Sequence, residues 1–90
     1  MNYMLCRHRV EDFDRWLRIF NSDLEGQQKA GLHLLYLLHD PTDRNHIVYL
    51  FRVDDVEKAR AFTETPEAEQ AANDSGVVGP FQLLWLTDLK

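Results

Sequence analysis

The chain has 90 residues, of which 44% are hydrophobic and 28% are charged, values typical of a folded protein rather than a disordered one. The sequence therefore predicts a single domain over residues 1–90, in which a chain this short buries only about 60 to 68% of its unfolded surface. The net charge of −5 argues against a nucleic-acid partner, because such partners are bound mainly through clustered Lys and Arg.

The cysteine content and the apolar runs bear on where the protein works. Cys6 is the only cysteine and cannot form a disulfide within the chain, which favours a reducing compartment. No apolar run approaches the ~20 residues of a membrane helix. Only six residues precede the first arginine, too few for the apolar core of a signal peptide. We therefore expect a cytoplasmic protein with no membrane partner.

Residues 2–10 alternate as a β-strand does, and the residues expected on its inner face are Met4, Cys6, His8 and Val10. Asp12 follows and is suited to cap a helix. One apolar stripe then recurs at spacings of three, four and seven residues: Phe13, Trp16, Leu17, Phe20 and Leu24. Gly31 is expected to end this helix in the left-handed conformation.

Residues 31–53 contain two apolar runs, 32–39 and 46–53, on either side of the polar segment 40–45. This pattern predicts a β-hairpin. Strict alternation in the first run places Leu32, Leu34, Tyr36 and Leu38 on one side, and Leu35 and Leu37 on the other. The sheet is therefore expected to be apolar on both faces.

The remaining segments predict two short helices and a final strand. Asp54 with Glu57 three residues later forms a capping-box pattern, opening a helix whose inner positions include Val56, Ala59 and Phe62. Thr65 and Pro66 begin a second helix that extends to about Ser75. Its inner residues are small and are expected to let it approach the sheet closely: Ala68, Ala71 and Ala72. The last strand is expected over residues 81–89.

The order β-α-β-β-α-β predicts an α+β fold of the ferredoxin-like kind with an antiparallel sheet. Because β-α-β crossovers are right-handed, both helical segments are expected on the same side of that sheet. The other side is then apolar and bare, which exceeds what a monomer usually exposes. We therefore predict a homodimer in which this face meets its copy.

Several segments together resemble a known family. They are the run 8–16, then Gly31, Asp54 with Phe62, Gly76 and Val77, and Gly79 with Pro80. The chain resembles the small dimeric α/β-barrel proteins, which are similar in fold to the antibiotic biosynthesis monooxygenases. The resemblance implies that two ferredoxin-like subunits face their sheets together to form a dimeric α/β barrel. That superfamily includes cofactor-free oxygenases, lactone isomerases, haem enzymes and proteins with no assigned activity, so the fold does not choose among them.

His8 is the candidate catalytic residue. It is expected on the inner face of the sheet near Trp16, where it would act as a general base toward an acidic carbon or phenol, because the pKa of histidine lies near neutral pH. The alternative is a core histidine that only hydrogen-bonds to the backbone.

Four aromatic residues are candidates for binding a flat ligand, since they join a large apolar area to a polar group: Trp16, Tyr36, Tyr49 and Trp85. The alternative is that they belong to the core or to the dimer interface.

No pattern in the sequence points to a metal or cofactor. His39, Asp40, Asp43 and His46 gather around the hairpin turn, but their spacing fits no metal-binding motif. The sequence lacks a glycine-rich phosphate loop, a CxxC pair, an HExxH motif and a GxSxG elbow. We rank haem below an organic ligand and predict neither a metal nor a cofactor.

Three hypotheses for function remain open. The first is a homodimer that binds a small apolar or aromatic molecule between its sheet and helices. The second is a cofactor-independent monooxygenase or isomerase with His8 as general base. The third is a non-catalytic assembly or regulatory module. The sequence does not decide whether the protein is an enzyme.

Overall fold

The computed structural model describes residues 1–89, and Lys90 lies outside this range. Its elements in chain order are β1 (Asn2–Val10), α1 (Phe13–Lys29), β2 (Leu32–Asp40), β3 (Asp43–Val53), α2 (Val56–Thr63), α3 (Pro66–Asp74) and β4 (Val77–Thr87). The four strands form one antiparallel sheet in the order β2-β3-β1-β4. This arrangement confirms the predicted ferredoxin-like topology, with α2 and α3 together forming the second helical segment.

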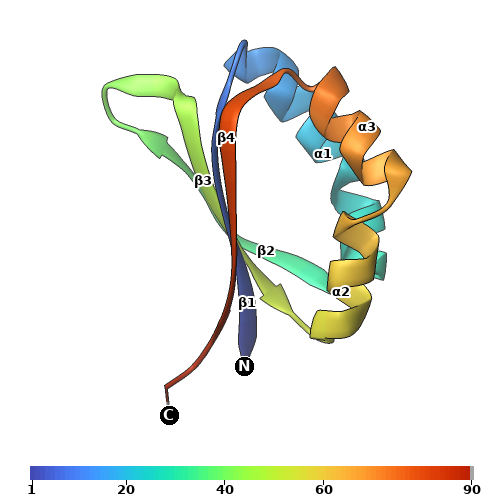
Figure 1. Cartoon of the computed structure of the whole chain (residues 1–90). Coiled ribbons are helices and arrows are strands. Elements are labelled where there is room, and N and C mark those ends of the chain that lie inside the picture. The colour runs from blue at the N-terminus through green and yellow to red at the C-terminus, as the bar shows by residue number, and fades with distance from the viewer. Residues whose placement is uncertain (90) are drawn as a thin grey trace.

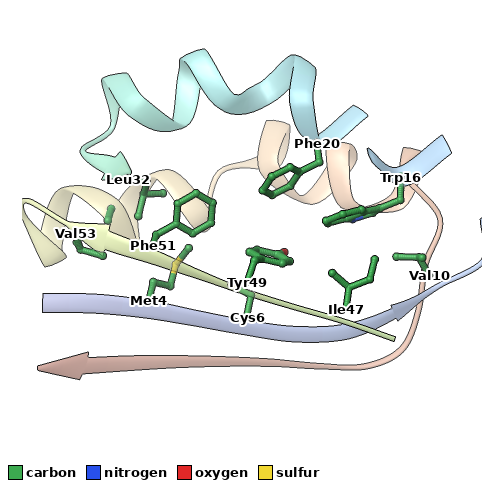
Figure 2. Close-up of a cluster of buried hydrophobic side chains, with 11 residues drawn as sticks. Met4, Cys6, Val10, Trp16, Phe20, Leu32, Ile47, Tyr49, Phe51 and Val53 are labelled. Carbon is green, nitrogen blue, oxygen red and sulfur yellow. The ribbon is translucent and has the colours of Figure 1, made fainter. Parts of the chain in front are cut away.

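All three helices lie on the same side of the sheet (Figure 1). The core lies between them and the inner face of the sheet, and its least exposed large side chains are Phe51, Leu32, Ile47 and Cys6. Figure 2 shows Trp16 and Phe20 pointing from α1 toward Tyr49 and Cys6 on the strands. The predicted inner face of β1 is confirmed, because its four even-numbered residues from 4 to 10 are all buried.

Helix α1 begins and ends where the sequence predicts. The Asp12 carboxylate accepts a hydrogen bond from the Arg15 backbone N–H at 3.2 Å, which satisfies a free amide of the first turn. Trp16 and Phe20 are buried, and the rest of the predicted stripe packs against the core. Gly31 has a φ of +82° and ends the helical run in the left-handed conformation.

The boundaries of the later elements differ from the predictions. Asp55 caps α2 by accepting from the Lys58 backbone N–H, so the predicted cap at Asp54 is wrong. Asp54 instead accepts a hydrogen bond from His33 Nε2 at 2.7 Å. The hairpin turn is shorter than the predicted 40–45, since cross-strand pairing continues to Asp40 and Asp43. Strand β4 begins four residues earlier than predicted because Val77 and Val78 pair with the end of β1.

A bulge in β2 changes which side chains face outward. Leu34 lies opposite Phe51, but Tyr36, and not Leu35, lies opposite Leu50, so the chain gains one residue at this point. Beyond the bulge, Leu37 packs against the core, whereas Tyr36 and Leu38 are exposed. The prediction that Tyr36 and Leu38 share a side with Leu32 and Leu34 is therefore wrong, since it assumed unbroken alternation.

Helix α3 does not seal the core. None of its residues is fully buried, and its three inner alanines, Ala68, Ala71 and Ala72, are only partly covered. The prediction that these small residues bring α3 closely onto the sheet is wrong. They leave open space beneath the helix instead, and that space is the site described below.

The outer face of the sheet, opposite the helices, carries an apolar row that crosses all four strands. Tyr36 pairs with Leu50, Leu50 with Leu5, and Leu5 with Leu84. Tyr36 and Leu84 are 60% and 51% exposed. Within residues 1–89, no helix combines the length and the apolar character needed to span a membrane.

Candidate functional site

A cleft of about 830 Å³ lies between the inner face of the sheet and the helices α1 and α3. Trp16 and Phe20 line it from α1, and Tyr49 lines it from β3. The three alanines of α3 form much of the opposite wall. Ligand sites of this volume are typical for molecules with several rings, and apolar walls are typical of such sites.

The structure brings three of the five predicted site residues together. His8, Trp16 and Tyr49 all line the cleft. Tyr36 does not, because the bulge in β2 turns it onto the outer face. Trp85 also lies outside the cleft, where it packs against the edge of the core beneath the Arg60 guanidinium, 5.5 Å from the ring centroid.

His8 and Tyr49 are hydrogen-bonded to each other at the floor of the cleft, and Cys6 lies opposite Tyr49 on the neighbouring strand. His8 Nδ1 lies 3.3 Å from the Arg9 carbonyl oxygen, which can only accept, so Nδ1 carries the proton of the neutral ring. His8 Nε2 is then an acceptor, and the Tyr49 hydroxyl donates to it at 3.1 Å.

Burial controls the protonation of His8, Cys6 and Tyr49. Desolvation lowers the pKa of His8 from its ordinary 6.5, and the hydrogen bond to the Arg9 carbonyl opposes this only in part. Desolvation also raises the pKa of Cys6 to about 12 and raises the pKa of Tyr49. At neutral pH the site therefore holds a neutral imidazole, a neutral phenol and a neutral thiol.

Aromatic rings enclose His8. Phe81 stacks on the imidazole with ring centroids 4.9 Å apart, and the Trp16 and Tyr49 rings meet it edge-on at 5.7 and 5.5 Å. His8 is consequently only 2% exposed, whereas Phe81 is 45% exposed. The sequence identifies Phe81 only as an apolar position of the last strand. Its stacking on His8 depends on the register shift between β1 and β4 near Arg7 and Arg9. Gly79, with a φ of +72°, and Pro80 mark this irregularity in the sequence, but they do not indicate where the Phe81 ring lies.

One polar group of the cleft wall has no partner. Gln27 on α1 lines the cleft, and its Oε1 is buried without a hydrogen bond to any residue in the range 1–89. Buried acceptors of this kind are usually paired with a donor from the protein, from water or from a ligand.

The polar residues around the hairpin turn are engaged with other partners. Asp43 forms an ion pair with Arg9, and His46 Nε2 accepts from Arg7 Nε at 2.9 Å. His39 Nδ1 lies 2.8 Å from the Asp40 carbonyl oxygen. Across residues 1–89, no three His, Cys, Asp or Glu side chains are grouped closely enough to hold a metal ion.

The arrangement supports two kinds of chemistry. The apolar walls and aromatic rings suit a flat organic molecule. The neutral His8 is in the protonation state of a base, but both of its nitrogens are already hydrogen-bonded and Phe81 covers one ring face. A proton from a bound molecule would therefore reach His8 through the Tyr49 hydroxyl, or directly after Phe81 moves aside.

Comparison with solved structures identifies the fold. The chain aligns over 99% of its length with 93% of a variant of SnoaB, a cofactor-independent oxygenase from Streptomyces nogalater, at a TM-score of 0.77 and 14% identity. It aligns over 100% of both chains with an antibiotic biosynthesis monooxygenase, at a TM-score of 0.75 and 14% identity. It also aligns over 98% of its length with 94% of an uncharacterized NIPSNAP domain protein from Burkholderia xenovorans, at a TM-score of 0.68 and 12% identity.

These similarities confirm the predicted resemblance to the antibiotic biosynthesis monooxygenase fold. At such low identities they concern the fold alone, and one of the matched proteins is itself uncharacterized. No protein-family model and no curated protein matches the sequence.

The burial of His8 predicts how stability depends on pH. Because the folded pKa of His8 lies below its unfolded value of 6.5, the unfolded chain binds more protons below that pH. The His8 contribution to stability is therefore complete above pH 6.5 and is lost as the pH falls below it toward the folded pKa. We expect the melting temperature to drop between about pH 7 and about pH 5, and the drop to be smaller in His8→Gln.

His39→Gln is the matched control, because His39 is exposed, and it should retain the full drop. The carboxylates with lowered pKa values, such as Asp54, titrate below their ordinary 3.8 and lie outside this window. If the melting temperatures of the wild-type protein and His8→Gln depend equally on pH, the lowered pKa of His8 is contradicted.

Proposed function

We propose that this chain, which has the fold of the antibiotic biosynthesis monooxygenase structures, is a homodimer that binds a flat, mostly apolar aromatic molecule between its sheet and helices. The observation that carries the proposal is the cleft of about 830 Å³ whose walls include Trp16, Phe20, Tyr49 and Phe81. The buried free thiol of Cys6 favours a reducing compartment and supports a cytoplasmic location.

The aromatic walls are arranged to hold a planar ring. Trp16 and Phe20 stack with their centroids 4.8 Å apart, and Tyr49 approaches both, at 5.7 and 5.1 Å. Offset and edge-on contacts at these distances add about 0.5–1.5 kcal/mol per pair beyond the area they bury, which keeps the walls in place when the cleft is empty. A ring system from a ligand extends the same stack toward the alanines of α3.

Binding of naphthylmethanol tests this part of the proposal. The two tryptophans serve as internal reporters, since Trp16 lines the cleft and Trp85 lies outside it. In an NMR titration, the indole N–H signal of Trp16 should shift and that of Trp85 should not.

Filling the cleft should abolish the effect. Ala71→Phe places a ring in the cleft and should remove the Trp16 shift at the same probe concentration. Ala61→Phe adds the same ring at an exposed position outside the cleft and should leave the shift intact. A Trp16 signal that does not move in the wild-type protein would exclude this function.

The homodimer is supported by the outer face of the sheet. A continuous row across four strands is formed by Tyr36, Leu50, Leu5 and Leu84, and the helices of residues 1–89 all lie on the other side (Figure 1). At about 25 cal/mol per Å² of apolar surface, covering such a row is strongly favourable. A second copy, related by a two-fold axis, presents the same row and covers it symmetrically.

A charge in this row should separate the subunits. We expect native mass spectrometry to give twice the 10.6 kDa chain mass for the wild-type protein. Leu84→Lys should weaken the dimer by about 30-fold or more, because it buries an unpaired charge in the row that the second copy covers. Leu89→Lys introduces the same charge at a residue outside β4 that is already fully exposed, and should leave the dimer intact. A wild-type protein that stays monomeric at high concentration would contradict the dimer.

A second candidate function is cofactor-independent oxygenation or isomerisation with His8 as general base. The observation that favours it is that the unprotonated His8 Nε2 accepts a hydrogen bond from the Tyr49 hydroxyl, 3.1 Å away, at the floor of the cleft. In the first step the bound molecule gives a proton to the Tyr49 oxygen while the Tyr49 proton passes to His8 Nε2. The products are a substrate anion, an unchanged phenol and an imidazolium. Reaction of the anion with O₂ makes an oxygenase, and its reprotonation elsewhere makes an isomerase.

His8→Gln distinguishes this enzyme from a non-catalytic module. With naphthol as the probe, the wild-type protein should consume O₂. His8→Gln should still bind naphthol but should consume O₂ at least about 100-fold more slowly, which is the usual size of a general-base effect. A binding module shows no O₂ consumption in either protein, and that result would exclude naphthol oxygenation.

A further inference from the structure

The charged side chains that line the cleft all have the same sign. They are the carboxylates of Asp23, Glu64, Glu67 and Glu69. No lysine or arginine within residues 1–89 lines the cleft, and none of these four carboxylates forms an ion pair there. The one histidine of the lining, His8, is neutral because of its burial.

We propose that the cleft takes an aromatic ligand that carries a protonated amine, and that it discriminates against aromatic carboxylates and phosphates. This inference rests on the proposed binding function and goes beyond it by naming the charge of the ligand. Three features of the site, described next, support it independently of one another.

The first feature is the negative potential. Carboxylates without a basic neighbour attract a cation and repel an anion, and each partly exposed pair contributes only weakly. Asp23 matters most, because it is half-buried on α1 and therefore less screened than the three exposed glutamates. A walled cleft also focuses the field of its charges.

The second feature is the aromatic floor. The Trp16, Phe20 and Tyr49 rings lie within 4.8 to 5.7 Å of one another. The faces of aromatic rings carry partial negative charge and attract an ammonium group within about 6 Å. They offer no such attraction to a carboxylate.

The third feature is Gln27. Its buried Oε1 has no donor among residues 1–89, and Gln27 lies one helical turn from Asp23 on the same wall. An ammonium offers three protons to such an acceptor, whereas a carboxylate offers none.

Three probes with the same ring test the inference: naphthylmethylamine, which is a cation at neutral pH, naphthylmethanol, which is neutral, and naphthoate, which is an anion. Affinities come from the Trp16 indole shift. We expect the amine to bind at least about tenfold more tightly than naphthoate, because several weak charge contacts add. The affinity of the alcohol should lie between those of the other two probes. At about 1 M salt the difference should shrink, since the Debye length falls to about 3 Å.

Two matched variants separate a local effect from the net charge. Asp23→Asn removes a carboxylate from the cleft wall and should reduce the preference for the amine. Glu25→Gln removes the same charge from the same helix outside the cleft, and should leave the preference unchanged.

The outcomes distinguish this inference from the proposed function. The inference is overturned if naphthoate binds as tightly as the amine, or if the two variants have equal effects on the preference. The proposed function is upheld in that case if naphthylmethanol binds. If none of the three probes moves the Trp16 signal, both are overturned.

Discussion

The structure depends on one constraint: a sheet that is apolar on both faces has helices on only one of them (Figure 1). On the inner face, α1 buries Trp16 and Phe20 against the strands, and each such side chain contributes about 1.5–3 kcal/mol (Figure 2). Helix α3 covers the same face only loosely and leaves the cleft. The outer face retains an exposed apolar row that a second copy of the chain is suited to cover. The two faces thus divide the proposed roles, with ligand binding on one and assembly on the other.

Most of the fold follows from local patterns that the sequence displays. The alternation of β1, the helical stripe from Phe13 to Leu24 and the left-handed Gly31 each act within a few residues, and the structure confirms all three. The resemblance to the antibiotic biosynthesis monooxygenase fold is confirmed in the same way, because that resemblance consists mainly of caps, turns and core positions. For the site, alternation alone places His8 inside, and the helical stripe places Trp16 above it.

The features that the sequence does not predict arise from pairing between distant segments. The bulge that turns Tyr36 outward depends on how β2 pairs with β3, and the stacking of Phe81 on His8 depends on a register shift between β1 and β4. The bulge in β2 has no glycine or proline to mark it, whereas Gly79 and Pro80 mark the irregularity in β4 without indicating where Phe81 lies. The alanines of α3 carry a signal that is open to two interpretations, since small residues permit either close packing or an open cleft. The hydrogen bond between Tyr49 and His8 likewise depends on strands that meet only in the fold.

The most direct measurement of this division between the two faces is a crystal structure with a brominated naphthylmethanol, in which the anomalous signal of bromine locates the ligand. We predict a bromine peak between α1 and α3, next to Trp16, and a second copy of the chain seated on the row formed by Tyr36, Leu50, Leu5 and Leu84. The division of roles between the two faces would be contradicted by a bromine peak on the outer face of the sheet. It would also be contradicted if helices α1 and α3 were closed together with no space for a ring.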